Sequence, residues 1–81
     1  MNKTMTQWEW LNNFSKALKS ELEYAGMTQR DLADAAGLSE SVISEYLHKK
    51  KVPTVKSVVN ICQALGIYTD DLINFEKRIY Q

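Results

Sequence analysis

The sequence is short of residues that bind metals or form cross-links: it has one cysteine, Cys62, and one histidine, His48. A lone cysteine cannot form a disulfide within the chain, and neither residue has neighbouring ligands with which to share a metal ion. This composition suits a reducing compartment. We therefore expect a cytoplasmic protein that binds no metal, with Cys62 as a small buried thiol.

Long apolar runs are also missing. No segment approaches the roughly 20 apolar residues that a membrane-spanning helix needs, and the N-terminal MNKTMTQWEW is too polar for a signal peptide. We therefore expect no contact with a membrane. The patterns of an enzyme are missing too, because there is no paired-carboxylate cleft, no nucleophile with a base and no glycine-rich phosphate loop. We expect no catalytic residue, no cofactor and no small-molecule substrate.

The chain has no net charge, since ten basic residues balance ten acidic ones. It thus lacks the overall positive charge that many DNA-binding domains carry. The charges are nevertheless segregated along the chain. Residues 30–48 hold one arginine and four carboxylates, whereas residues 49–56 hold four lysines and no acidic residue. Any attraction for a polyanion must therefore be local to the second segment.

Helix signals, in contrast, are frequent. Thr6 and Glu9 have the spacing of a capping box, so a first helix is predicted over residues 7–25, ended by Gly26 in the left-handed conformation. Together with its cap, this helix forms an N-terminal extension over residues 6–25 that precedes the second and third helices. Its main apolar stripe comprises Trp8, Leu11, Phe14, Leu18, Leu22 and Ala25.

Four more helices follow from the same signals, each after a serine or threonine that can cap its first turn. They cover residues 29–36, 40–48, 55–65 and 70–80, after the caps Thr28, Ser39, Thr54 and Thr69, with Gly37 and Gly66 as C-terminal signals. No segment alternates as a strand does. We predict an all-α fold, a compact bundle of five short helices forming a single domain over residues 1–81.

The second and third predicted helices are separated only by residues 37–39, so the chain must reverse sharply between them. Gly37 supplies the positive φ for this reversal, and Ala33 is small where the two helices cross. This is a helix-turn-helix layout over about residues 28–48. The polar residues of the third helix fall on one arc, formed by Glu40, Ser41, Ser44, Glu45 and His48.

The segment MTQRDLADAAGLSESVISEYLHKKKVPTVKSVVNICQALGI resembles the phage repressor and Cro-type helix-turn-helix family, also called lambda repressor-like or Xre-like. In that family, Gln opens the second helix, Ala-x-x-x-Gly makes the turn and Ile-Ser lies on the recognition helix. The resemblance covers about residues 18–73. It implies a lambda repressor-like fold and a regulator of transcription that binds double-stranded DNA, and it favours a repressor of a phage or other mobile element.

The resemblance also implies which residues contact DNA, with the third helix in the major groove. Base contacts would come from Glu40, Ser41, Ser44 and Glu45, and phosphate contacts from Gln29, His48, Lys49, Lys50, Lys51 and Thr54. A glutamate is repelled by phosphates but accepts a hydrogen bond from cytosine N4. The glutamates would therefore reduce affinity and sharpen selection, while the lysines supply attraction through counterion release.

These residues also have purely structural interpretations. Glu40 complements the helix dipole, and Glu45 with Lys49 forms a favourable i,i+4 pair. Gln29 could act only as a local cap, His48 could simply be exposed, and the lysines could form a solvated loop. Lys49 also stands where the family usually has glycine, which leaves open where the third helix ends and how the loop continues.

Two apolar flanks lie outside the main helix stripes, at Trp10, Ala17 and Tyr24 on the first helix and at Ile73 and Tyr80 on the last. Each flank is either additional core or a partner surface. We assign Trp10, Tyr24, Ile73 and Tyr80 to a dimer or partner surface, and expect a homodimer because half-sites ~34 Å apart suit this motif. The alternative function is an antitoxin or other protein-binding module that masks a partner protein and represses its own operon.

Overall fold

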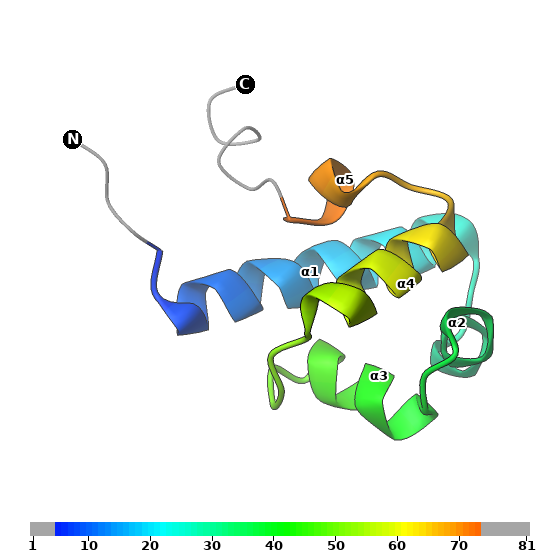
Figure 1. Ribbon diagram of the computed structural model, residues 1–81, viewed down its shortest axis with the longest axis horizontal. Coiled ribbons are helices and arrows are strands. Elements are labelled where there is room, and N and C mark those ends of the chain that lie inside the picture. The colour runs from blue at the N-terminus through cyan, green and yellow to red at the C-terminus, as the bar shows by residue number, and fades with distance from the viewer. Residues whose placement is uncertain (1–4, 74–81) are drawn as a thin grey trace.

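A computed structural model describes residues 5–73 of the chain, and this part folds into five helices without a strand (Figure 1). The helices are α1 (Gln7–Ala25), α2 (Gln29–Ala36), α3 (Glu40–Leu47), α4 (Val55–Leu65) and α5 (Thr69–Ile73). The all-α prediction is confirmed. The rest of the predicted last helix, over residues 74–80 and including Tyr80, lies outside the described residues.

Hydrogen bonds from capping side chains start the helices as predicted. In the capping box of α1, the Thr6 hydroxyl accepts from the Glu9 N–H at 3.1 Å and the Glu9 carboxylate accepts from the Thr6 N–H at 2.9 Å. Thr28 and Asp31 make the same pair of bonds at α2. The side chains of Ser39 and Thr54 cap α3 and α4.

The cap predicted for the fifth helix is wrong by one residue. Thr69 is the first helical residue of α5 rather than the residue before it. The free N–H at this helix start belongs to Tyr68, and it donates to the Asp71 carboxylate at 3.0 Å. The Asp71 carboxylate therefore accepts from the residue before the helix, as the acidic residue of a capping box does.

The first four helices all end in a left-handed residue. Gly26, Gly37 and Gly66 have φ of 68°, 70° and 70°, and Lys49, after α3, has φ of 61°. The Lys49 N–H donates to the Tyr46 carbonyl at 3.2 Å and the Lys50 N–H to the Glu45 carbonyl at 2.8 Å. These two bonds make up a Schellman motif. The helix after Ser39 therefore ends at Leu47, one residue before the predicted end, and Lys49 adopts the backbone conformation that favours glycine.

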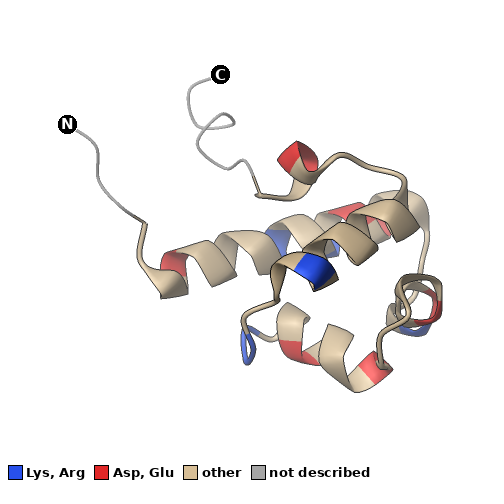
Figure 2. Cartoon of the chain, in the orientation of Figure 1, with Lys and Arg blue, Asp and Glu red and all other residues tan. Residues whose placement is uncertain are grey.

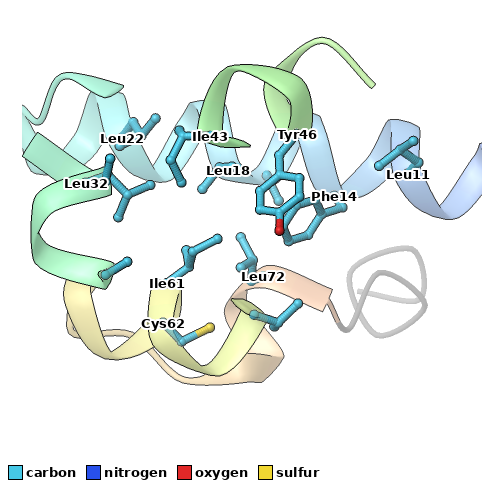
Figure 3. Close-up of a cluster of buried hydrophobic side chains, with 14 residues drawn as sticks. Leu11, Phe14, Leu18, Leu22, Leu32, Ile43, Tyr46, Ile61, Cys62 and Leu72 are labelled. Carbon is cyan, nitrogen blue, oxygen red and sulfur yellow. The ribbon is translucent and has the colours of Figure 1, made fainter. Parts of the chain in front are cut away.

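The core lies between α1 and the four other helices (Figure 3). Its fully buried large side chains are Phe14, Leu18, Leu32, Ile43, Ile61 and Leu72. Cys62 is buried as predicted, and burial, followed by the charges of Asp71 and Glu21, raises the pKa of its thiol. No helix within residues 5–73 combines the length and apolar character that crossing a bilayer requires.

Two members of the predicted α1 stripe are exposed, which corrects the sequence-based assignment. Trp8 is 64% exposed and Ala25 is exposed too, whereas the four residues between them are buried. The reason is length. A helix of 19 residues is about 28 Å long, while α2 and α3, with eight residues each, span only about 12 Å. The ends of α1 therefore extend beyond the elements that cover its middle.

Candidate nucleic-acid interface

Helix α3 lies at the edge of the bundle with one side in the core and the other toward solvent (Figure 1). Ile43 and Tyr46 are buried, as predicted, and Val42 and Leu47 are half-buried. On the polar side, the side chains of Glu40, Ser41 and His48 are exposed, and those of Ser44 and Glu45 are half-buried. The predicted polar arc therefore reaches solvent, with Glu45 less open than Glu40.

Four of the predicted DNA-contacting residues line one shallow hollow on this side of the molecule. Gln29, the first residue of α2, lies there with Glu40, Ser41 and Ser44 of α3. The hollow thus brings the first turn of α2 beside the first two turns of α3. Its lining consists of amide, hydroxyl and carboxylate groups, all of which can hydrogen-bond to the edges of bases or to a phosphate.

A second hollow adjoins the first, because Gln29 also lines it. Here Thr28 and Gln29 at the start of α2 meet His48 at the end of α3 and Lys19 on α1. Lys19 was not among the predicted site residues. Its place on this side depends on how α1 crosses α2 and α3, and no local sequence signal reports that crossing.

The imidazole of His48 is turned back onto α3. Its Nδ1 lies 2.8 Å from the Ser44 carbonyl oxygen and 3.3 Å from the Ser44 hydroxyl. With the ring proton on Nδ1, the imidazole donates to the carbonyl and leaves Nε2 directed elsewhere. The imidazole thus adds a second bond to the Ser44 carbonyl, which already accepts the His48 N–H at 2.9 Å, and it keeps one ring nitrogen for a further partner.

The lysine loop, defined as residues 49–51, joins α3 to the segment before α4, and all three lysines are exposed. Figure 2 shows this positive charge in the α3–α4 connection, beside the carboxylates of α3. The three ammonium groups are not equivalent, because Lys49 Nζ lies 6.0 Å from the centroid of the Trp8 ring.

Thr54, a predicted phosphate contact, uses its hydroxyl within the protein. The hydroxyl accepts from the Ser57 N–H at 3.1 Å, and its O–H donates to the Ser57 hydroxyl oxygen at 3.1 Å. The side chain is therefore committed to the first turn of α4. What remains for an anion at this helix start is the unpaired main-chain N–H groups of the first turn.

The first half of α1 holds α3 in place. Ser15 is buried and its hydroxyl donates to the Tyr46 carbonyl at 2.5 Å. The Phe14 and Tyr46 rings meet edge to face with centroids 6.0 Å apart (Figure 3). The Trp10 ring stacks on Phe14 with centroids 5.2 Å apart. Ser15 was missed by the sequence analysis, because a serine among apolar residues gives no sign of a partner on another helix.

The residues assigned to a partner surface do not lie together. Trp10 is half-buried on Phe14, while Tyr24 is 92% exposed near the other end of α1. Fourteen residues of helix separate them, a distance of about 21 Å. Ile73 is half-buried against the core, and Ala17 is part of the core itself. Within the described residues, Tyr24 is the assigned residue that is most open to a partner.

Comparison with known proteins relates this arrangement to one family and to several solved structures, three of which are described here. A family model described as helix-turn-helix matches residues 18–72. The restriction-modification controller protein C.AhdI from Aeromonas hydrophila has 22% identity and a TM-score of 0.75, over 76% of this chain and 94% of its own. The clp gene regulator ClgR from C. glutamicum has 25% identity and a TM-score of 0.77, over 89% of this chain and 94% of its own.

The third structure is the hypothetical transcription factor NHTF from Neisseria, with 16% identity and a TM-score of 0.80 over 100% of this chain and 95% of its own. A comparison with curated proteins found no significant match. The family match begins at residue 18, so residues 7–17, which carry Trp8 and Ser15, precede the matched segment.

Proposed function

Because the chain belongs to the helix-turn-helix family, we propose that it is a transcriptional regulator that binds double-stranded DNA in a sequence-specific manner. In this proposal α3 enters the major groove and the start of α2 faces the sugar-phosphate backbone. The observation that carries the proposal is the hollow in which Gln29 meets Glu40, Ser41 and Ser44. It joins a polar helix face to a helix N-terminus, which are the two parts such a contact needs.

Base contacts are assigned to Glu40, Ser41, Ser44 and Glu45, and phosphate contacts to Gln29, His48, the lysine loop and the main chain at Thr54. The carboxylates favour cytosine N4 as a donor and are repelled by phosphates. The lysine loop, which lies beside them without an acidic neighbour in residues 49–56, supplies the attraction. Specificity and affinity therefore come from different residues.

Two further assignments complete the proposal. We assign the protein to the cytoplasm and propose that it represses genes of a phage or other mobile element. We also propose a homodimer, since two copies would occupy half-sites about 34 Å apart. Tyr24, which is 92% exposed, favours a second candidate, an antitoxin that masks a partner protein and represses its own operon. Co-purification of a tightly bound protein partner with the expressed chain would select the second candidate, and sedimentation on DNA would test the dimer.

The central experiment selects bound duplexes from a random pool and compares the selected duplex with a scrambled one over a range of salt concentrations. We expect the selected duplex to bind about a thousandfold more tightly or better. We also expect NMR signals of amides in residues 39–51 to shift when this duplex is added. Equal binding of all duplexes at low ionic strength, with those amide signals unmoved, would refute the proposal.

A further inference from the structure

A contact between α1 and the lysine loop has no part in the function proposed so far. The Lys49 ammonium lies 6.0 Å from the centroid of the Trp8 indole, at the limit of a cation–π contact. Trp8 is 64% exposed, so the core does not account for its position. The ring is instead available to the side chain of the first residue of the loop.

The backbone at Lys49 makes this contact relevant to the whole loop. Lys49 is the one residue other than glycine with positive φ among residues 5–73. A side chain disfavours this conformation, which therefore persists only where surrounding contacts support it. The turn at residue 49 sets the direction in which the chain continues to Lys50 and Lys51.

The contact also belongs to a larger connection between the start of α1 and the end of α3. Ser15 bonds to the Tyr46 carbonyl, and the same carbonyl accepts the Lys49 N–H. Trp8 and Ser15 both precede residue 18, where the helix-turn-helix match begins. Residues 7–17 thus contact the end of α3 at both its main chain and its following loop.

We propose that Trp8 is a positioning residue for DNA binding: its ring holds the Lys49 side chain and the left-handed turn, and so presents Lys50 and Lys51 to the phosphates. For Lys49 this replaces the phosphate contact assigned to the whole lysine loop above: its side chain serves as an internal tether, and the phosphate contacts of the loop come from Lys50 and Lys51. The proposal rests on the proposed DNA-binding function. It divides the lysine loop into one structural and two phosphate-binding residues.

Salt dependence separates these two kinds of lysine. Each phosphate that a lysine neutralises adds about 0.9 to the magnitude of the slope of log K against log salt. We expect Lys50→Ala and Lys51→Ala each to lower this magnitude by about that amount on the selected duplex. Lys49→Ala should leave the slope unchanged and weaken binding about two- to fivefold, as expected for loss of an exposed cation–π contact.

Variants of Trp8 provide the matched test. Trp8→Leu should weaken binding by the same factor as Lys49→Ala with the wild-type slope, and the double variant should be no weaker than either single one. Trp8→Phe and Lys49→Arg, which keep a ring and a cation, should retain most of the affinity. Tyr68→Leu removes another exposed aromatic ring and should bind as wild type does.

An NMR measurement on the free protein tests the contact without DNA. The Lys49 Hε protons should be shifted upfield by the indole relative to those of Lys50, and Trp8→Leu should abolish the shift. An unshifted Lys49 signal overturns the tether. A slope that falls in Lys49→Ala as it does in Lys50→Ala overturns the positioning role alone, whereas a wild-type protein that prefers no duplex refutes the DNA-binding function as well.

Discussion

The Ser15 hydroxyl of α1 and the main-chain carbonyl of Tyr46 in α3 are joined by a buried hydrogen bond of 2.5 Å. Carbonyls in the last turn of a helix lack a partner within the helix. The Tyr46 oxygen has two, because it also accepts the Lys49 N–H at 3.2 Å. One oxygen atom therefore links α1, the end of α3 and the lysine loop.

Replacing Ser15 with alanine should lower the free energy of unfolding by about 1 kcal/mol. This loss is at the lower end of the range expected for removing a buried hydrogen bond, because the Tyr46 carbonyl keeps its bond to the Lys49 N–H. Urea unfolding of Ser15→Ala measures this change. Ser20→Ala is the control, since Ser20 is exposed on the same helix; equal midpoints for the two variants would argue against the assigned role of the bond.

Gly66→Ala should destabilise the protein by about 1 kcal/mol through the backbone alone. Gly66 has φ of 70°, and a Cβ added there would meet no atom within 4 Å, so no clash contributes. Asparagine tolerates the left-handed conformation better than alanine does. The thermal unfolding temperature should therefore be highest for the wild type, intermediate for Gly66→Asn and lowest for Gly66→Ala. A Gly66→Asn variant that unfolds at the same temperature as Gly66→Ala would contradict this explanation.

The capping box of α2 should make stability depend on acid pH. The Thr28 N–H and hydroxyl lower the pKa of the Asp31 carboxyl below its ordinary value of 3.8. A carboxyl with a lowered pKa stabilises the fold at pH values above its ordinary pKa, and this contribution disappears as the pH falls through its pKa in the folded protein. NMR titration of the Asp31 carboxyl measures the shift directly.

Asp31→Asn should remove that part of the pH dependence. The unfolding midpoints of wild type and variant should differ at neutral pH and converge as the solution is acidified below the folded pKa. Asp34→Asn, an exposed position on the same helix, is the matched control. A difference between wild type and Asp31→Asn that persists unchanged in strong acid would show that the capping charge is not its source.

Glu45→Gln should change which duplex the protein selects. Glutamine pairs with adenine where glutamate accepts from cytosine N4, and a good base contact discriminates by about 1–3 kcal/mol. The preferred base at one position of the selected sequence should therefore change. Asp70→Asn removes an exposed carboxylate on α5, which is not one of the assigned site residues, and should leave the selection unaltered. An unchanged sequence from Glu45→Gln would remove Glu45 from the base contacts.

Features that depend on neighbouring residues were accessible from the sequence. Thr6 with Glu9, and Thr28 with the residues after it, act within one turn, so helix starts could be located from residue types alone. The same holds for Gly37, which ends α2 and turns the chain toward α3. The five helices and the helix-turn-helix followed from these local signals and from apolar periodicity.

Features that depend on how helices cross were not accessible. Periodicity placed Trp8 in the apolar stripe, yet nothing in a stripe tells how far the covering helices extend. The bond from Ser15 to Tyr46 and the place of Lys19 beside Gln29 arise from the same crossings. Lys49 is a further case, because it has φ of 61° although its residue type disfavours this conformation, and the nearby Trp8 ring comes from another helix.

The bond between Ser15 and Tyr46 spans 31 positions of the chain. During synthesis, the serine leaves the ribosome well before its acceptor does. The first half of α1 therefore cannot pack against α3, and Phe14 and Trp10 stay uncovered on that side, until α3 has left the ribosome. The segment that precedes the helix-turn-helix in the chain completes its packing only after that motif is made.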